Sequence, residues 1–454
     1  MVHRPLLIPW LTTLTVGILI TVASVNLGPA LDLDLVEPVH TYPHIDKAGS
    51  ITIGVVVDQQ HLPSLDGKLV FADFVLGHIS SLDPITHEAT LHRNTAEEGP
   101  YLMVAGFAQN STDLILVDRA LGPLRAQEDD GVLSFVDANL DLPRFPRAPI
   151  AAVPMHDDRW CLVEQVGSVL CEGIGVLIDL GTEVARSDWE QGLLGLAFDV
   201  NFSENSRYFL SWTENGTDDV LVTSHVAMHD DNGTLNGTDR TRDIVLLRVP
   251  QHSQRHNGGH LEVDDQGRLL ASFGDGTDIA DRFGEASDPR TLMGTIVRIL
   301  PTEEGYEIPP DNPHSDGLSG HPAVLAHGFR NPWTFTIDAS GIIWVGDVGA
   351  AEVEEISILV PGGHHGWAYF EGDRCQQHPS PTYVNHRCSG FDAQGTRDWF
   401  ESRVLTAPVV LIPIVVMTLL ALLIRTPNQG GKTQGSPEGH PGHDGDANRA
   451  RHDG

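Results

Sequence analysis

The sequence predicts an all-β protein, and within that class a β-propeller, from three observations. Short apolar runs separated by turns recur between residues 44 and 400, where no long segment has the apolar periodicity of a helix. The runs are irregularly spaced, as expected when loops of different length join similar sheets. A pattern of apolar strand, polar turn and second strand occurs four times, at Gly106–Asp118, Leu196–Trp212, Leu261–Asp275 and Phe335–Asp347. Such repeated units favour a propeller, with a β-sandwich as the alternative.

The composition sets limits on the class of protein and its partners. Hydrophobic residues make up 41% of the 454-residue chain and charged residues 20%, which is enough apolar material for a large core. The formal net charge of -34 means that the surface repels nucleic acid and anionic lipid head groups. We therefore expect no nucleic-acid partner, and small neutral or cationic ligands are easier to accommodate.

Two apolar segments predict attachment to a membrane. Residues 1–25 contain the run PLLIPWLTTLTVGILITVAS, which is long enough to cross a bilayer. This segment is either an anchor or an export signal, because the small residues at 22–24 would also suit cleavage. Residues 404–424 are apolar or small and uncharged, and they predict a transmembrane helix.

The residues that flank these segments predict their orientation. Arg4 precedes the first segment, and Arg425 and Lys432 follow the second. Because positive flanks remain on the cytoplasmic side, both termini are expected in the cytoplasm and the body, residues 44–400, outside it. Residues 425–454 are rich in Gly, Pro, His and polar side chains, a composition typical of a disordered tail.

Cysteine spacing and glycosylation motifs agree with an extracytoplasmic body. Cys161 and Cys171 flank a stretch with strand alternation and a glycine, whereas Cys375 and Cys388 bracket a loop that contains proline. We predict two short-range disulfides formed in an oxidising compartment, since neither spacing is that of a zinc site. Five Asn-X-Ser/Thr sequons lie in the body, at Asn110, Asn201, Asn215, Asn232 and Asn236.

The stretch that begins at His256 is the strongest candidate site. Two apolar runs, Leu261–Val263 and Leu269–Phe273, are joined by a polar turn with a glycine and predict a β-hairpin. Antiparallel pairing would return Asp275, at the end of the hairpin, to His256 at its start. A carboxylate beside an imidazole orients it and raises its basicity, as a general base requires. The alternative is that the two residues only stabilise their own hairpin.

Five groups of residues follow one another in an unbroken order between about residues 155 and 390. They are Trp189-Glu-Gln-Gly-Leu-Leu-Gly-Leu-Ala-Phe198, His256-Asn-Gly-Gly with Gly274-Asp275, His327-Gly-Phe-Arg-Asn-Pro-Trp333, Gly346-Asp-Val-Gly349 and Gly362-Gly-His-His-Gly-Trp367. Together they resemble the successive signatures of the soluble glucose/sorbosone dehydrogenase family. The resemblance implies a six-bladed propeller that binds pyrroloquinoline quinone (PQQ) and calcium and oxidises a small sugar.

The order of the blades differs from that of the family. Ser50–Gly54 and Leu65–Gly77 resemble blades that follow the last of these motifs in the family, but here they precede the first. The resemblance therefore predicts a circular permutation. Residues 44–150 would form blades like the family's last two, and residues 151–400 blades like its first four. Propellers tolerate such a change because neighbouring blades contact each other in the same way wherever the chain is cut.

The resemblance also assigns catalytic roles to three residues. His256 would remove the proton of the sugar C1 hydroxyl while hydride passes to the quinone, and Asp275 would orient it. Arg330 would stabilise charge that develops on the reduced cofactor.

The remaining assignments concern the cofactor and its metal. Arg330 and Asn331 match positions that contact the quinone oxygens, and Glu190 matches a position on the substrate side. Thr52 is assigned to the cofactor as well. Gly349 and Ala350 match the backbone carbonyls that hold calcium, a hard ion suited to oxygen ligands.

One feature of the family is missing. PQQ has three carboxylates, and family members meet them with lysine and arginine from the late blades. The matching loops here, residues 74–77 and 104–109, contain no cation, and the whole chain has only three lysines. His260 also stands where an arginine is common. Tight quinone binding would therefore need arginines from other loops, since an unpaired carboxylate in a desolvated site costs a few kcal/mol.

Two functions are consistent with these residues. The first is a membrane-tethered, extracytoplasmic aldose sugar dehydrogenase that depends on PQQ and calcium and passes electrons to a membrane acceptor. The second is a non-catalytic extracellular propeller that binds a glycan or a protein partner. The retained residues of the candidate site favour the first, and the missing carboxylate anchors favour the second.

Overall fold

The computed structural model describes residues 35–375, apart from 46–47, 230–234, 238 and 278–280. In this part of the chain the strands form six antiparallel sheets, each built around four strands. Among the described residues, helical structure is limited to two single turns, α2 (Thr95–Glu98) and α3 (Phe202–Asn205), and one 3-10 turn at Gly181–Glu183. The all-β prediction is confirmed.

The first three sheets follow the order of the chain. The first contains β2 (Ile51–Val56), β3 (Leu69–Asp73), β4 (His78–Leu82) and β5 (Ala89–Asn94). The second contains β6 (Val104–Gln109), β7 (Leu114–Asp118), β8 (Gly122–Asp129) and β9 (Val132–Asp137). The third contains β10 (Pro149–Pro154), β11 (Trp160–Glu164), β12 (Ser168–Cys171) and β13 (Gly175–Asp179).

The next two sheets carry the longer insertions. The fourth contains β14 (Leu193–Phe198), β15 (Arg207–Thr213), β16 (Val220–Val226) and β19 (Ile244–Val249). The fifth contains β20 (Leu261–Val263), β21 (Leu269–Phe273), β22 (Thr295–Pro301) and β24 (Val324–His327), with the short β23 (Tyr306–Glu307) also paired to β22. Two small ribbons lie outside the six sheets, β17 (Met228–His229) with β18 (Leu235–Asn236) and β28 (Phe370–Glu371) with β29 (Arg374–Cys375).

The sixth sheet joins the two ends of the described chain. It contains β25 (Pro332–Ile337), β26 (Ile343–Asp347), β27 (Val353–Ile358) and, as its outer strand, β1 (His40–Pro43). β1 pairs antiparallel with β27 from His40 opposite Ile356 to Pro43 opposite Val353. Proline is tolerated there because an outer strand has no neighbour on its far side. β1 lies just before residue 44, the predicted start of the propeller, so the ring begins earlier than expected.

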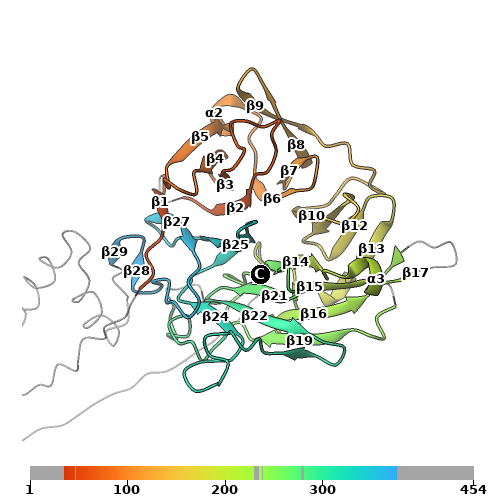
Figure 1. Ribbon diagram of the computed structural model, residues 1–454, viewed down its shortest axis with the longest axis vertical. Helices are drawn as coiled ribbons and strands as arrows, with labels where there is room; N and C mark the ends of the chain where they lie inside the picture. The colour runs from red at the N-terminus through yellow and green to blue at the C-terminus, as the bar shows by residue number, and fades with distance from the viewer. Residues whose placement is uncertain (1–34, 46–47, 230–234, 238, 278–280, 376–454) are drawn as a thin grey trace, which may run out of the picture. The chain divides into compact units, whose positions relative to one another are not determined.

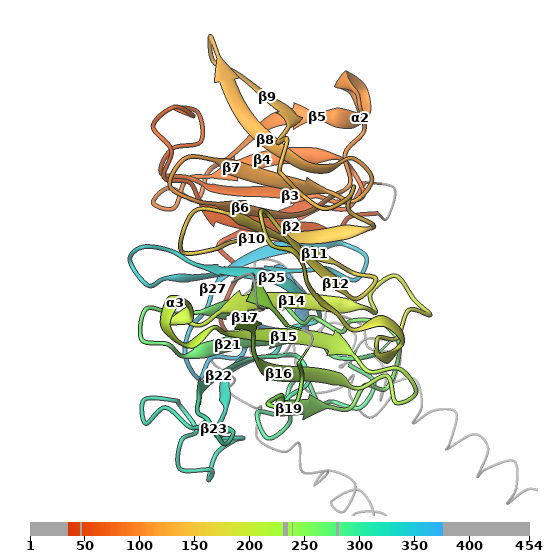
Figure 2. The same cartoon turned by 90° about the vertical axis from the view of Figure 1, so that its right-hand side faces the viewer.

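The six sheets are the blades of a propeller, as predicted, and the sandwich alternative is wrong. The innermost strand of each blade packs against the next blade, from β2 to β6, β10, β14 and β20. β21 then packs on β25, and β25 packs on β2, which completes the ring (Figure 1). Within one blade the strands follow outward from the axis, as Figure 2 shows for β14, β15, β16 and β19. The blade from β2 to β5 therefore lies between β25 and β6.

Apolar side chains between the blades form the core. All six residues of β14 and all five of β7 are buried. These strands are buried on both faces because each blade is covered by a blade on either side, so both alternating sets of side chains meet a neighbour. The short apolar runs of the sequence reflect this arrangement.

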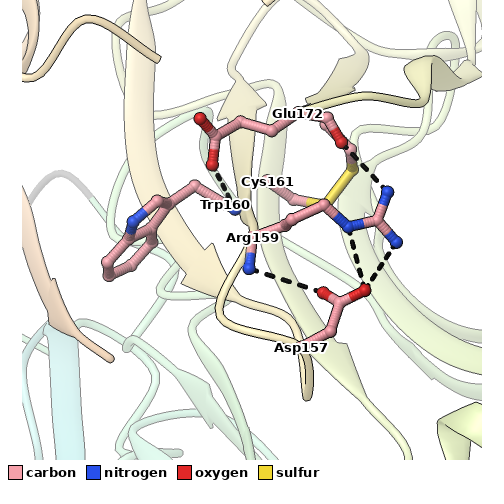
Figure 3. Close-up of a disulfide and its surroundings, with 6 residues drawn as sticks. Asp157, Arg159, Trp160, Cys161 and Glu172 are labelled. Carbon is pink, nitrogen blue, oxygen red and sulfur yellow. Dashed lines mark hydrogen bonds and ion pairs between the residues drawn. A yellow bond between two sulfur atoms is a disulfide. The ribbon is translucent and has the colours of Figure 1, made fainter. Parts of the chain in front are cut away.

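One predicted disulfide is present, between Cys161 and Cys171, with Cα atoms 4.1 Å apart. The two cysteines face each other in the register of β11 and β12. Glu172, next to the bridge, accepts a hydrogen bond from the backbone N–H of Trp160 at 2.9 Å, and its carbonyl accepts one from Arg159 (Figure 3). The predicted hairpin between the cysteines is thus confirmed.

Several predictions concern residues that lie outside the described part of the chain. They are the apolar segments at 1–25 and 404–424, the tail at 425–454 and the pairing of Cys375 with Cys388. Among the residues that are described, no helix has the length and apolar character needed to cross a membrane.

Candidate functional site

Strand direction gathers the candidate residues at one end of the ring. In an antiparallel blade, the start of the inner strand lies at the same end as the turn between the second and third strands. Glu190 precedes the inner strand β14, His256 precedes β20, and Arg330 precedes β25. Gly349 and Ala350 lie in the turn between the second and third strands of the sixth blade. Residues from separate blades therefore meet near the axis.

A cavity of about 420 Å³ lies at this end. Its volume is within the range of small-molecule sites. The predicted residues in its lining are Thr52, Glu190, His256, Arg330, Asn331, Gly349 and Ala350. Asp275 is fully buried next to His256. A second cavity of about 320 Å³ runs between the inner strands and includes His260, but none of the predicted site residues.

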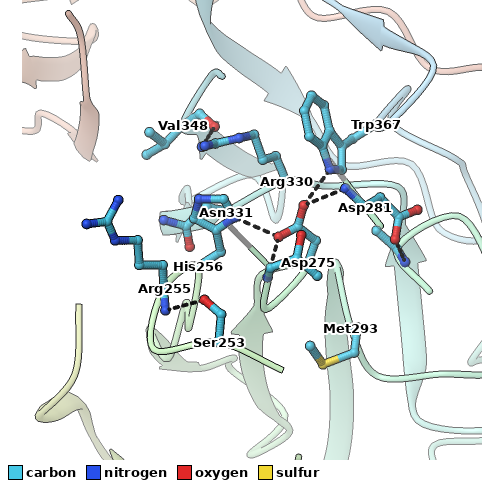
Figure 4. Close-up of polar contacts among 12 residues, drawn as sticks. Ser253, Arg255, His256, Asp275, Asp281, Met293, Arg330, Asn331, Val348 and Trp367 are labelled. Carbon is cyan, nitrogen blue, oxygen red and sulfur yellow. Dashed lines mark hydrogen bonds and ion pairs between the residues drawn. The ribbon is translucent and has the colours of Figure 1, made fainter. Parts of the chain in front are cut away.

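His256 and Asp275 form a buried pair. Nδ1 of His256 lies 2.6 Å from Oδ1 of Asp275, so the predicted proximity is confirmed (Figure 4). The carboxylate can only accept, which places the imidazole proton on Nδ1 and the lone pair on Nε2. His256 has a φ of 57°, a left-handed conformation that is uncommon for a non-glycine residue and is found at functional sites. Gly274 permits the close approach, because a Cβ there would lie 2.2 Å from the carbonyl oxygen of His256.

Asp275 has partners on both carboxylate oxygens. Oδ1 also accepts a hydrogen bond from the backbone N–H of Thr277 at 3.0 Å. Oδ2 accepts from the indole Nε1–H of Trp367 at 2.7 Å and from the backbone N–H of Asp281 at 3.3 Å. Burial acts to raise the pKa of Asp275, but the hydrogen bond from His256 and the charge of Arg330 outweigh it and lower the pKa. Asp275 therefore remains a carboxylate.

One carboxylate oxygen of Glu190 accepts hydrogen bonds from residues of two other blades. Oε2 accepts a hydrogen bond from the backbone N–H of His256 at 2.6 Å and from Nδ2 of Asn331 at 3.2 Å. The side-chain oxygen of Asn331 in turn accepts from the backbone N–H of Gly258 at 3.2 Å. Because Glu190, His256 and Asn331 precede the inner strands of three consecutive blades, this network fixes their relative positions.

Asp347 fixes the backbone of Arg330 and Asn331 through hydrogen bonds. The two carboxylate oxygens of Asp347 accept hydrogen bonds from the backbone N–H groups of Arg330, at 2.9 Å, and Asn331, at 2.7 Å. Burial raises the pKa of Asp347. The guanidinium of Arg330 donates to the carbonyl of Val348 at 2.9 Å and lies 5.7 Å from the ring of Trp367 (Figure 4).

The backbone at Gly349 and Ala350 presents its carbonyl oxygens away from the buried Glu371. Oε1 of the buried Glu371 accepts hydrogen bonds from the N–H groups of Ala350, at 2.8 Å, and Ala351, at 2.9 Å. A trans peptide points its C=O opposite to its N–H, so the carbonyls of Gly349 and Ala350 point away from Glu371. Gly349 is required here, because a Cβ would lie 1.8 Å from the carbonyl oxygen of Val353. Within the described residues, no group of three or more His, Cys, Asp or Glu side chains could hold a metal ion.

The cavity lining also includes residues to which the sequence assigned no role in the site, among them Arg119, Trp189 and Arg255. Trp189 and Arg255 directly precede the predicted residues Glu190 and His256, so adjacency in the chain was a usable signal. Arg119 follows β7 and had no such signal. The loops at 74–77 and 104–109, where cations were sought, contribute only apolar side chains to the cavity, from Phe74, Val75 and Ala105.

The fold and the site together define a six-bladed propeller with a buried histidine–carboxylate pair in a central small-molecule cavity. Residues 147–393, more than half of the chain, match the Glucose / Sorbosone dehydrogenase family, and the chain belongs to that family. The first two blades precede the matched residues.

Individual relatives are distant and longer. The chain is 25% identical to the HIPL2 protein of Arabidopsis thaliana, over 42% of this chain and 34% of that protein. It is 29% identical to the human Hedgehog-interacting protein, over 33% of this chain and 23% of that protein. The match to quinoprotein glucose dehydrogenase B of Acinetobacter calcoaceticus is 27% identical and covers 42% of each chain. The chain thus spans about a third of the length of the curated plant relative and less than half of the bacterial one.

Among solved structures, the PQQ-bound form of aldose sugar dehydrogenase from Streptomyces coelicolor is similar. The identity is 20% and the TM-score 0.41, over 52% of this chain and 66% of that one.

Proposed function

We propose that this protein oxidises the C1 hydroxyl of an aldose sugar in a reaction that depends on PQQ and calcium. The observation that carries the proposal is the buried pair of His256 and Asp275, 2.6 Å apart, in the wall of a small-molecule cavity. Because Nδ1 carries the proton that Asp275 accepts, Nε2 is the basic atom that takes the hydroxyl proton. PQQ, when bound, supplies the acceptor for the hydride.

The other residues of the cavity bind and orient. The guanidinium of Arg330 and the side-chain amide of Asn331 donate hydrogen bonds to oxygen atoms of the cofactor, where negative charge develops. Glu190 fixes the backbone of His256 and the amide of Asn331 on the substrate side of the cavity. Thr52, which lies in β2 of the first blade, also lines the cavity.

The residues present fit calcium as an oxygen-liganded ion. Glu371 draws the N–H groups of Ala350 and Ala351 inward, so the carbonyls of Gly349 and Ala350 are turned outward for a hard cation. These two carbonyls would supply only part of the six to eight oxygens that calcium takes, and the cofactor and water would supply the others.

We also propose that the propeller lies outside the cytoplasm and is tethered by the apolar segments at 1–25 and 404–424, with both termini inside, so that electrons pass to a membrane acceptor. The Cys161–Cys171 disulfide supports an oxidising compartment. The exposed sequon residues Asn201 and Asn215 are accessible for glycosylation. Protease added to intact cells should digest the propeller and spare the tail after Arg425. Loss of the tail before the propeller would refute this topology.

The enzymatic proposal is tested with the full-length protein supplied with PQQ and calcium. Turnover of glucose and other aldoses is followed with a dye acceptor. We expect His256→Ala to lower turnover by on the order of 10²-fold or more. His252→Ala is the matched control, because this histidine lies in the same loop, is partly exposed and pairs with Glu285 outside the cavity. Equal turnover by the two variants would remove His256 from the mechanism.

A second candidate function is a non-catalytic propeller that binds a glycan or a protein. The similarity to the human Hedgehog-interacting protein and to HIPL2 supports it, as does the lack of cations in the loops at 74–77 and 104–109. This candidate predicts that the wild-type protein neither binds PQQ nor oxidises any aldose.

A further inference from the structure

The cavity carries a charge opposite to that of the protein as a whole. The chain has a formal net charge of -34, yet three arginines, Arg119, Arg255 and Arg330, line the cavity against one carboxylate, Glu190. That carboxylate is already engaged by the backbone N–H of His256 and the amide of Asn331. A concentration of positive charge inside a concave site attracts anions, because the low-dielectric walls focus the field.

Of the three arginines that line the cavity, Arg119 has the least compensated charge. It is half-buried, and burial is the cause that lowers its pKa. No carboxylate among the described residues forms an ion pair with it. By contrast, the half-buried Arg144 and Arg207 have strong carboxylate partners, Glu164 at 2.6 Å and Asp199 at 2.5 Å. A guanidinium withdrawn from water without a partner is costly, and an anionic ligand would relieve that cost.

Trp189 and Arg255 complete this side of the cavity. The guanidinium of Arg119 lies 5.7 Å from the ring of Trp189, and Trp189 is 74% exposed although it is large and aromatic. The guanidinium of Arg255 makes a long 3.5 Å contact from its Nε to Asp188, and more than half of this side chain is exposed. An exposed aromatic ring beside one guanidinium, with a second guanidinium in the same cavity lining, suits a flat ligand with acidic groups on its edge.

The arginines come from different blades. Arg119 follows β7 of the second blade, Arg255 precedes the fifth blade, and Arg330 precedes the sixth. They therefore reach the cavity from different directions, which suits a ligand whose acidic groups are spread around its edge rather than a single small anion. Arg119 also lies outside residues 147–393, the segment that matches the family.

We infer that Arg119 and Arg255 are the anion anchors of this cavity and that its ligand is a flat aromatic polycarboxylate, whose carboxylates contact these two residues while Arg330 and Asn331 contact its opposite end. The inference rests on the proposed function in taking the quinone as that ligand. The cations absent from the loops at 74–77 and 104–109 are thus replaced from other loops. A carboxylate requires a guanidinium at the right position, whichever blade supplies it.

Equilibrium binding by the full-length protein tests this inference without any measurement of turnover. PQQ is titrated by calorimetry in buffer that contains calcium, which the proposed function requires, and no chelator, because chelators are themselves polycarboxylates. Benzene-1,3,5-tricarboxylate, which is flat and acidic but cannot accept hydride, is titrated in parallel. We expect Arg119→Gln to weaken the binding of both ligands by about 10-fold or more, as expected for a charged hydrogen bond. Arg119→Lys should restore part of the loss.

Two variants serve as controls. Arg290→Gln removes an arginine that is mostly exposed and lies outside the cavity, so both ligands should bind it as they bind the wild type. Combining Arg119→Gln with Arg255→Gln should weaken binding further and make it less sensitive to salt, because fewer charges are then screened.

The outcomes separate this inference from the proposed function. If wild type and Arg119→Gln bind PQQ equally well, the assignment of Arg119 as an anion anchor is wrong. The dehydrogenase proposal then still stands. If wild type binds the tricarboxylate through Arg119 but shows no affinity for PQQ, the anion site is correct and the dehydrogenase proposal is wrong. Failure of wild type to bind either ligand overturns both.

Discussion

The indole N–H of Trp367 donates a 2.7 Å hydrogen bond to Oδ2 of Asp275, the carboxylate whose other oxygen contacts His256. Trp367 follows β27 of the sixth blade, whereas Asp275 lies just after β21, the second strand of the fifth blade. The carboxylate that orients the candidate base is therefore itself oriented from a neighbouring blade. Both partners are buried, so this contact links the stability of the fold to the geometry of the site.

Replacing this tryptophan tests the link. We expect Trp367→Phe to lower the free energy of unfolding by about 1–3 kcal/mol, because among the described residues Oδ2 of Asp275 then has only the longer bond from Asp281. Urea denaturation measures this change. Trp344→Phe is the matched control, since Trp344 is buried and donates a 3.0 Å hydrogen bond to Asp338 far from the cavity. Both variants should lose stability, and only Trp367→Phe should also lose sugar oxidation.

Asp275→Asn tests the tautomer of His256. The asparagine amide can donate to Nδ1 and so leave the proton on Nε2, where it blocks the base. Turnover should fall by on the order of 10²-fold or more, while PQQ binding measured by calorimetry should change little. Asp265→Asn, in the turn of the same hairpin, is the control and should be as active as wild type. Retained activity in Asp275→Asn would show that His256 needs no orienting carboxylate.

Asp281 predicts how stability depends on pH. Burial raises the pKa of Asp281 to about 7, against an ordinary value of 3.8. Between about pH 4 and pH 7, the unfolded chain therefore releases a proton that the folded protein retains, and stability falls as pH rises. The free-energy cost of ionising the buried Asp281 is fully present above pH 7 and absent below about pH 4.

Asp281→Asn removes this ionisation and keeps the geometry. Its amide oxygen can accept from the N–H of Ala286, and its nitrogen can donate to Ser287. We expect the variant to be more stable than wild type by more than about 1 kcal/mol at pH 8 and equal to it near pH 4. Denaturant unfolding at both pH values measures the difference. A constant difference between the two curves would place the pKa of Asp281 near its ordinary value.

The disulfide predicts a dependence on reducing agent. The double variant Cys161→Ala with Cys171→Ala should be less stable than the oxidised protein by about 2–3 kcal/mol, given the short loop that the bridge closes. Adding a reductant should destabilise wild type more than the variant in urea unfolding, because the variant no longer has this bridge to lose. Equal sensitivity of the two proteins would show that another thiol or bond is responsible.

Features that depend on short stretches of chain were predictable. The Cys161–Cys171 bridge and the approach of Asp275 to His256 each follow from one hairpin, because antiparallel register brings its two ends together over few residues. The propeller followed from the recurrence of such hairpins. The number of blades and the roles of the site residues came from the family resemblance, and those roles still await the experiments above.

Features that depend on ring closure were decided only by the tertiary structure. β1 (His40–Pro43) is too short and too polar to be recognised as the strand that completes the sixth blade. Arg119 reaches the cavity because the turn after β7 lies at the same end of the ring as His256, although no motif precedes it. The bond from Trp367 to Asp275 spans 92 residues. A sequence determines which segments pair locally, whereas the distances between separate blades are set only when six packed sheets close around one axis.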